Sequence, residues 1–214
     1  MLLAFHSSPR RKGNLERMVV QIAEETGLEY ELIRLADLDI AACNGCVGCA
    51  RTQRCVHHDD MTPLYPKLEA ARGVIMGGVN YNGRVNAQAH LFLERLFPLY
   101  HQTPAFRDLP AAVVAVGGEE PQRAADDILE YLRDVYFFQV VGTAIFKSDN
   151  PPCLSCGLGA ECPVGMPALH WTEAQRSRLA ACGLELKRRF EDHRPVIAAC
   201  RNLGHRLESA VTGA

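Results

Sequence analysis

The sequence predicts an α/β protein with a doubly wound, five-stranded parallel sheet, and two observations support this prediction. Short apolar runs alternate along the chain with segments in which apolar residues recur at helical spacing. Strands that alternate with helices favour a parallel sheet with helices on both faces. The chain has 214 residues, of which 48% are hydrophobic and 22% charged, so it can build one such domain with its own core.

Each expected strand is a short run of apolar or alternating residues. The first, third and fourth runs are continuously apolar, as is typical of strands buried on both faces, whereas the second run alternates. In chain order the runs are residues 2–5, 29–35, 74–79, 111–116 and 138–146. Right-handed crossovers leave few ways to arrange five such strands, and we expect the flavodoxin-like strand order 2-1-3-4-5.

Each expected helix repeats apolar residues every three or four positions. In chain order the helices cover residues 15–24, 61–71, 85–100 and 121–135, and two tail helices cover 172–192 and 194–209. We therefore expect a domain over residues 1–170 with cysteine-rich loops at 41–60 and 150–165. A C-terminal helical extension over residues 171–214 follows it.

Charge and hydropathy exclude two classes of partner. The net charge of −2 gives no basic surface for nucleic acid, and no segment approaches the roughly 18 apolar residues that a membrane span needs. The apolar run before Ser7 is too short for the apolar region of a signal peptide, so we expect a cytoplasmic protein. In that reducing compartment, nine cysteines favour metal binding or redox chemistry over structural disulfides.

The loop after the first strand has the composition of an anion site. It reads His-Ser-Ser-Pro-Arg-Arg-Lys-Gly-Asn from position 6, and a helix begins at its end. Free amides at a helix N-terminus, the hydroxyls of Ser7 and Ser8, and the side chains of Arg10 and Asn14 can all donate to phosphate oxygens. Gly13 permits a turn that most residues resist. The pattern is neither a Walker loop nor a dinucleotide fingerprint, and a polar helix-capping loop is the alternative.

This loop resembles the phosphate loop of the NADPH-dependent FMN reductases, whose pattern is Ser-Pro-Arg-x-x-Gly-Asn-Thr. The resemblance implies that Ser8, Arg10 and Asn14 contact the phosphate of FMN. Leu15 stands where that family has a hydroxyl residue.

Two further loops are expected beside the phosphate. The stretch Asn80, Tyr81, Asn82 and Gly83 is similar to the Ser-Pro-x-Tyr-x-Gly stretch that runs along the flavin ring in that family, and a packed rim aromatic is the alternative for Tyr81. Gly117 and Gly118 end the fourth strand and permit a close backbone approach. Ligands of doubly wound sheets lie beyond the C-terminal ends of the strands, so we expect the three loops to meet at one FMN site.

The first cysteine group consists of Cys43, Cys46, Cys49 and Cys55. Four cysteines in so compact an array are the ligand set of a [4Fe–4S] cluster. Zinc is the main alternative, although its sites more often use two separated pairs, and a metal-free redox dithiol is another.

The segment after this group ends in Asp59-Asp60-Met61, and with the cysteines it resembles the iron–sulfur flavoproteins. That resemblance implies FMN and a cluster in one protein, and a homodimer or homotetramer. We interpret Asp60 as a helix N-cap and Asp59 as its solvated neighbour.

The second cysteine group consists of Cys153, Cys156 and Cys162, and it predicts a second metal centre, with iron–sulfur and structural zinc equally open. His170, Cys182 and Cys200 are candidates for a fourth ligand, but the two cysteines lie on apolar helical stripes typical of core positions. The two groups follow opposite edge strands, whose ends are roughly 19 Å apart. We therefore expect two separate centres with the flavin between them.

These features predict a flavin-dependent oxidoreductase that transfers electrons between FMN and a [4Fe–4S] cluster, with ferredoxin, NAD(P)H or quinone as redox partner. The cofactors carry the chemistry, and no residue is assigned a catalytic role. One alternative is an NAD(P)H-dependent FMN or quinone reductase whose cysteines bind only zinc. Another is a non-enzymatic, zinc-stabilised binding or sensor module.

Overall fold

The computed structural model describes residues 1–102, 104–149, 153, 156, 158, 161–182 and 188–213, without the side chains of residues 179, 180 and 182. Its strands are β1 (Leu2–His6), β2 (Tyr30–Arg34), β3 (Gly73–Tyr81), β4 (Arg84–Val85), β5 (Pro110–Gly117) and β6 (Gln139–Lys147). Its α-helices are α1 (Asn14–Glu25), α2 (Cys49–Thr52), α3 (Leu64–Ala70), α4 (Ala87–Glu94), α5 (Pro121–Leu129), α6 (Met166–His170), α7 (Glu173–Cys182) and α8 (Arg194–Thr212). Shorter helical turns are η1 (Leu35–Asp37), η2 (Phe97–Leu99), the π-helical η3 (Glu130–Val135) and η7 (Phe190–Asp192).

The sheet confirms the predicted topology. Its parallel strands follow the order β2-β1-β3-β5-β6, which is the expected order 2-1-3-4-5 once β4 is set aside. The sixth strand, β4, pairs antiparallel with the end of β3. β4 was not predicted, because it has only two residues, too few to show a period.

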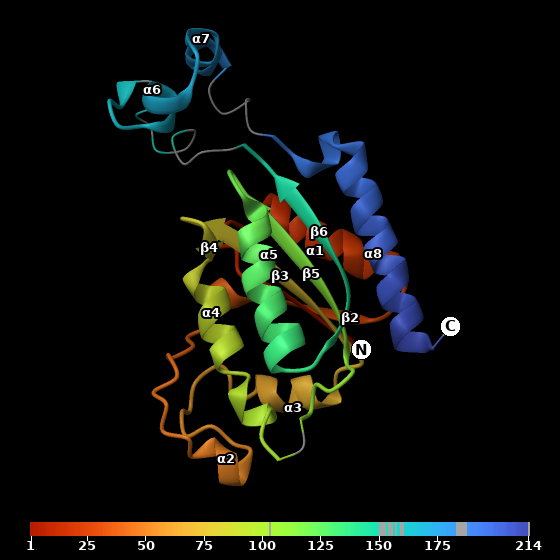
Figure 1. Ribbon diagram of the computed structural model, residues 1–214. Coiled ribbons are helices and arrows are strands. Elements are labelled where there is room, and N and C mark those ends of the chain that lie inside the picture. The colour runs from red at the N-terminus through yellow and green to blue at the C-terminus, as the bar shows by residue number, and fades with distance from the viewer. Residues whose placement is uncertain are drawn as a thin grey trace.

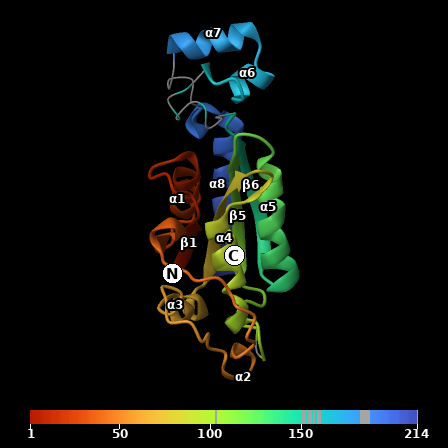
Figure 2. The ribbon, with the colours of Figure 1, turned by 90° about the vertical axis from the view of Figure 1, so that its left-hand side faces the viewer.

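Helices cover both faces of the sheet, as Figure 2 shows. On one face α1 and α8 bury Leu15, Met18, Leu203 and Leu207 against the strands. On the other face α3, α4 and α5 enclose a larger core that includes Phe5. α8 thus belongs to the helical layer that covers this face of the sheet. The division of the chain into two parts at residue 170 stays a prediction.

Several predicted boundaries are wrong. Residues 80–81 belong to β3 rather than to a loop, because the strand continues into a hairpin with β4. The helix expected over 85–100 is α4, which ends at Glu94. The helix expected over 172–192 is α7, which ends at Cys182, and residues 183–187 lie outside the described part. Among the described helices, none is long and apolar enough to cross a membrane.

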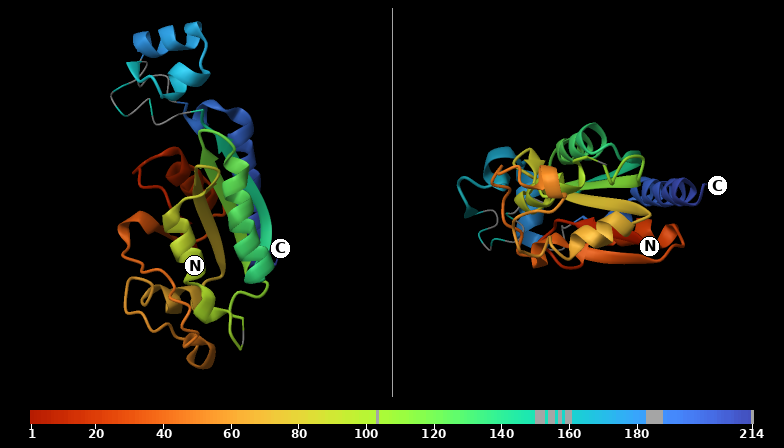
Figure 3. Two further views of the ribbon diagram at one scale, coloured as in Figure 1. Left: turned by 60° about the vertical axis from the view of Figure 1, so that its left-hand side comes forward. Right: turned by 90° about the horizontal axis from the view of Figure 1, so that it is seen from below.

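The two ends of the sheet carry different parts of the molecule. The five parallel strands run in one direction and end at one edge. α6 and α7 lie beyond that edge, at the top of Figure 1, whereas α2 lies at the opposite end, where the strands begin. The left-hand view of Figure 3 shows the same separation from another side.

Candidate functional site

The loop between β1 and α1, residues 7–13, is held rigidly by its neighbours. Ser7 is buried and its hydroxyl donates to Asn86 Oδ1, while Asn86 Nδ2 donates to the Ser7 carbonyl at 2.9 Å. From β2, Arg34 Nε donates to the Ser8 carbonyl at 3.2 Å, and its Nη2 donates to the Pro9 carbonyl. Asn86 and Arg34 therefore fix the path of this loop.

Neither of these two supports, Arg34 and Asn86, was predicted from the sequence. Arg34 could have been found as a charged residue at the last position of a strand, and Asn86 as the polar residue just before a helix. For Ser7 the structure shows a bond that holds the loop, and its role as a phosphate donor stays a prediction.

The β1–α1 loop presents donors to solvent at the start of α1. No side chain caps this helix, whose N-cap is Gly13, so the first-turn amides stay open to an acceptor. The guanidinium of Arg10 is exposed and has no hydrogen bond or ion pair with any described residue. The Ser8 hydroxyl accepts from the Arg10 amide at 3.2 Å and so shapes the turn. A partner-free arginine at an uncapped helix N-terminus fits a phosphate group.

One other predicted residue, Asn14, is engaged differently from expectation. Asn14 Nδ2 donates to the Arg188 carbonyl at 3.1 Å, and Asn14 Oδ1 accepts from the Phe190 amide at 3.2 Å. The carboxylate of Glu16 accepts the amide of Lys12 at 2.7 Å. The loop thus already offers one amide to an anionic acceptor, and Asn14 ties α1 to the C-terminal segment.

His6, the last residue of β1, is fully buried beneath this loop. Neither ring nitrogen has a hydrogen-bond partner, and Nε2 lies 3.8 Å from the Glu16 carboxylate. Burial lowers the pKa of His6, and the Arg34 charge lowers it further, against the opposing effect of Glu16. The imidazole is therefore neutral at pH 7 and adds no charge below the loop.

The loops after β3 and β5 lie against each other at the same edge. Asn82 (φ 55°) and Gly83 (φ 81°) form the two-residue turn of the β3–β4 hairpin, for which Asn-Gly is the favoured pair. Asn80 Nδ2 donates to the carbonyls of Glu119 and Glu120 at 2.6 and 2.8 Å. This bond places the predicted residues 80–83 beside Gly117 and Gly118.

Position 117 has room for glycine but not for a residue with a side chain. A β-carbon at this position would lie 2.8 Å from both Asn80 Cβ and the Glu119 carbonyl oxygen. Tyr81 is 48% exposed at the hairpin, so its ring is open to a ligand. The predicted residues after β1, β3 and β5 all lie at the strand ends, where ligands of doubly wound sheets bind.

The first cysteine group lies elsewhere, at the end of the sheet where the strands begin. Its four cysteines border one cavity together with Arg95, Phe97 and His57. Cys49 is buried, and burial together with the neighbouring thiolates of the group raises its pKa. Val47 has φ 57°, unusual for a β-branched residue and costing roughly 1–3 kcal/mol, and it lies between two of these cysteines.

The expectation that both cysteine groups lie at the same end of the sheet is wrong, because the first group lies at the opposite end. Asn86, just before α4, contacts the β1–α1 loop, and Arg95, just after α4, borders the cysteine cavity. The two residues are nine positions apart along this helical segment, a rise of roughly 14 Å. The long 41–60 loop carries its cysteines from the end of β2 down the side of the molecule.

A buried ion pair that the sequence did not reveal closes the neck of this loop. Asp59 pairs with both terminal nitrogens of Arg95, whose side chain is 1% exposed. The Asp59 carboxylate also accepts the amides of Ala41 at 3.0 Å and Met61 at 3.1 Å. Asp59 is therefore not a solvated neighbour. Asp60 is not a helix cap either, because its carboxylate accepts the amide of Asp39 at 2.7 Å.

The second cysteine group lies with α6 at the other end of the molecule. The β-carbon position of Gly165 lies 3.5 Å from Cys153 Sγ and 3.2 Å from Cys162 Cβ, and Cys156 Sγ donates to the Cys153 carbonyl at 3.5 Å. The three candidates for a fourth ligand lie in different places. His170 is exposed at the end of α6, and Cys200 is fully buried in the core beneath α8. The Cys182 side chain lies outside the described residues. Burial raises the pKa of Cys200 to about 12, as suits a core thiol.

Among the described side chains, no three metal-binding groups converge closely enough to hold a single ion. A cluster differs from a single ion in this respect, because each thiolate binds a different iron atom. The four thiols around one cavity are compatible with that arrangement, and the cationic Arg95 beside them balances anionic charge.

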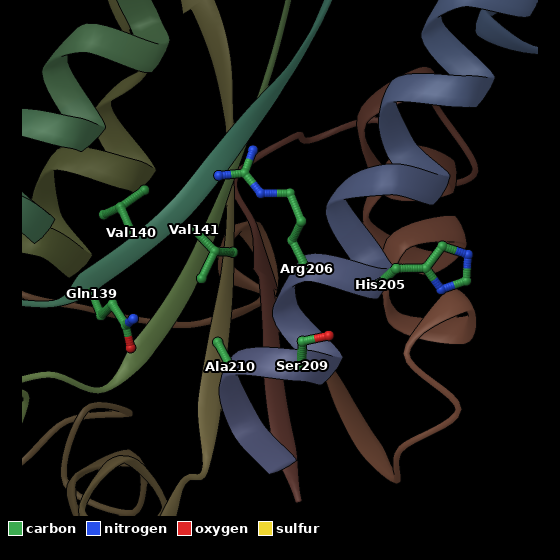
Figure 4. A pocket seen from close by; sticks show the side chains of 7 residues that line it. All are labelled: Gln139, Val140, Val141, His205, Arg206, Ser209 and Ala210. Carbon is green, nitrogen blue, oxygen red and sulfur yellow. The ribbon is translucent and has the colours of Figure 1, made fainter. Parts of the chain in front are cut away.

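A groove of about 460 Å³ lies between β6 and α8, as Figure 4 shows. Its lining residues are Gln139, Val140, Val141, His205, Arg206, Ser209 and Ala210. Gln139 begins β6, so the groove lies at the end of the sheet away from the β1–α1 loop. It contains none of the predicted site residues.

Comparison with known proteins gives consistent results. The family profile of the NADPH-dependent FMN reductases matches residues 1–150. An iron–sulfur flavoprotein of Methanosarcina thermophila is 31% identical over 114 residues, which are 52% of this chain and 60% of that protein. An iron–sulfur flavoprotein of Methanocaldococcus jannaschii is 30% identical over 159 residues, 73% of this chain and 80% of that protein.

Solved structures support the fold. A flavone reductase superposes with a TM-score of 0.61 at 16% identity, covering 99% of this chain and 63% of that one. The two-electron reduced flavodoxin of Megasphaera elsdenii superposes with a TM-score of 0.51 at 13% identity, covering 98% and 99%. At such low identity these likenesses show the fold alone.

Proposed function

Because this chain belongs to the NADPH-dependent FMN reductase family, we propose that it is a flavin-dependent oxidoreductase with FMN at the ends of β1, β3 and β5. We further propose that its first cysteine group holds a [4Fe–4S] cluster and exchanges electrons with the flavin. The observation that carries the proposal is the pairing of an uncapped, arginine-bearing loop at one end of the sheet with four thiols around one cavity at the other.

The residues at the strand ends fit an FMN molecule. Arg10 and the first-turn amides of α1 would hold the phosphate, since both present unpaired donors to solvent. The hairpin with Tyr81 and the backbone at Gly117 would border the flavin ring, because Gly117 has no side chain between the two loops. FMN supplies chemistry that accepts and releases one or two electrons, and the chain's residues orient it.

The first cysteine group fits a cluster better than a structural zinc ion. Zinc needs four ligands at one point in a tetrahedron, whereas these four thiols surround a cavity. Arg95 stays protonated because its pKa is raised by Asp59 despite the burial that opposes it. Its fixed positive charge would stabilise the net negative charge of four thiolates and a cluster.

The redox partners follow from the same proposal. NAD(P)H is the expected electron donor because the family profile is that of NADPH-dependent enzymes. Ferredoxin and quinones are the other partners we propose, and a cytoplasmic location accords with them. A homodimer or homotetramer would bring the cluster of one copy toward the flavin of another, and sedimentation of the purified protein tests this.

The visible spectrum of anaerobically purified protein, with iron, sulfide, zinc and FMN analysis, tests the whole proposal. We expect flavin absorption together with iron and acid-labile sulfide. Serine at all four positions of the first cysteine group should remove the iron bound at that group but leave FMN, and serine at the buried Cys200 is the matched control. FMN without iron would leave an NAD(P)H-dependent reductase with zinc. Colourless protein carrying zinc alone would support a binding module and refute the proposal.

A further inference from the structure

The two cysteine groups share one spacing. In the first group the last three cysteines are separated by two and then by five residues, and the three cysteines of the second group are separated in the same way. The first group has one more cysteine, Cys43, three positions before this shared pattern. The residue at the equivalent position of the second group is Asn150, which lies outside the described residues. The second group thus repeats the first with one thiol fewer.

Two cysteines of the second group lie against the backbone of Gly165. Cys153 Sγ and Cys162 Cβ both approach the missing β-carbon of Gly165, at 3.5 and 3.2 Å. The backbone of Gly165 has φ −75° and ψ 156°, which any residue can adopt. Its lack of a side chain therefore serves the space between the cysteines and not the conformation of the chain.

The segment with the second group begins and ends at the flavin end of the sheet. Before it, Ser148 donates to the Gly117 carbonyl through its amide at 2.8 Å and its hydroxyl at 3.0 Å. After it, Arg188 and Phe190 bond to the side chain of Asn14 at the start of α1. Both anchors belong to loops of the proposed FMN site, and Figures 1 and 2 show α6 and α7 beyond the same edge.

We propose that the second cysteine group is a separate metal site that holds an iron–sulfur cluster on three thiolates, at the flavin end of the same chain. The inference goes beyond the proposed function, which assigns the cluster to the first group alone, and it rests on that function for the position of the flavin. A closed structural zinc site needs a fourth protein ligand. Of the three candidates, Cys200 is buried in the core between α8 and the sheet. His170 is exposed at the end of α6, and the Cys182 side chain lies outside the described residues. The shared spacing favours the same type of centre in both groups.

The two cysteine groups therefore lie at different distances from the proposed flavin site. The first group lies at least a helix length from the β1–α1 loop, across the body of the domain. The second group lies on a segment whose two anchors touch that loop and the end of β5. It would therefore supply a one-electron centre on the flavin side of its own chain, with Cys156 exposed to solvent.

The test measures iron, acid-labile sulfide, zinc and FMN per chain in full-length protein purified without air. One variant carries serine at all three positions of the second group, and its matched control carries serine at all four positions of the first group. We expect each variant to lose roughly half of the wild-type iron and sulfide, since each centre is a cluster of its own, and to retain FMN.

The outcomes separate this inference from the proposed function. Wild-type iron in the second-group variant would overturn the inference, as would the loss of one zinc in place of iron. Iron loss in the second-group variant alone would support the inference while contradicting the cluster at the first group. Absence of FMN from all of the proteins would refute the proposed function and leave the metal measurement valid.

A variant that keeps every thiol tests the geometry. Gly165→Val places a branched side chain between Cys153 and Cys162 on a backbone that tolerates it. We expect iron to fall to the level of the three-serine variant, with FMN unchanged. Full iron retention in Gly165→Val would show that the thiols do not enclose the space beside residue 165 and would overturn the proposal.

Discussion

Replacing Asp59 by Asn is expected to open the neck of the 41–60 loop. The Asp59 carboxylate accepts hydrogen bonds from two backbone amides and from both terminal nitrogens of Arg95. The side chain of Arg95 is 1% exposed and that of Asp59 is 12% exposed, so the pair is shielded from water. A neutral amide leaves the guanidinium as an uncompensated buried charge.

The size of the effect follows from this burial. Removing one partner of a buried ion pair costs about 3–5 kcal/mol. Asn retains one carbonyl oxygen that can still accept from Arg95, so we expect Asp59→Asn to lose about 3 kcal/mol of unfolding free energy, the lower end of that range. Asp60→Asn is the matched control, because Asp60 is exposed and, among the described residues, its carboxylate accepts the Asp39 amide alone. It should lose no more than about 1 kcal/mol.

Urea unfolding at pH 7, followed by circular dichroism, measures both variants beside the wild type. The rate of iron release to a chelator, measured on the same proteins, reports the cysteine loop itself. Faster release is expected for Asp59→Asn alone, because Asp59 joins the two ends of the loop. Equal stability of the two variants, or equal rates of iron release, would show that the ion pair does not hold the loop and would refute the reasoning.

Three further outcomes are expected. Arg10→Ala should weaken the affinity for FMN by roughly tenfold or more, because one charge-assisted contact is worth about 1.5–3 kcal/mol. FMN titration followed by fluorescence measures this affinity, and an unchanged value would show that Arg10 does not bind the phosphate. Gly117→Ala should lower the free energy of unfolding by about 1–3 kcal/mol, because the new methyl group would lie 2.8 Å from Asn80 Cβ. Thermal unfolding measures this loss, with Gly13→Ala as the control, because a β-carbon at position 13 meets no atom closer than 3.4 Å. Acid should narrow the difference in stability between wild type and Asp59→Asn. Burial raises the pKa of Asp59, but bonds from the guanidinium and backbone amides outweigh it, so its folded-state pKa lies below the ordinary value. The contribution is present above the unfolded-state pKa of about 3.9 and is lost as pH falls through the folded-state pKa. A gap of unchanged size from pH 7 down to pH 2 in urea unfolding would contradict this.

Much of the fold could be predicted because it depends on the local periodicity of hydrophobic residues. The apolar runs gave the parallel strands, and handedness rules then gave their order, which the sheet confirms. The family was predicted from the motif at Ser8, Pro9 and Arg10, which lies within the matched residues 1–150. Short elements escaped prediction: β4 has two residues, and its existence depends on the hairpin turn at Asn82 and Gly83.

The supports of the candidate site could not be predicted in the same way. Asn86 binds Ser7 across 79 residues of sequence, Asp59 binds Arg95 across 36, and Asn14 binds the Arg188 carbonyl across 174. No local pattern marks such pairs, because each forms only when packing brings two distant segments together.

The sequence by itself determined the parallel sheet, the three loops at its strand ends and the composition of two cysteine groups. Only the tertiary structure decided that these groups lie at opposite ends of the sheet, and that a buried arginine and aspartate close the first loop. The physical reason is that hydrophobic periodicity fixes which faces are buried, whereas the path of a long polar loop depends on the side chains it meets. For residues 41–60 those side chains follow α4, far along the chain.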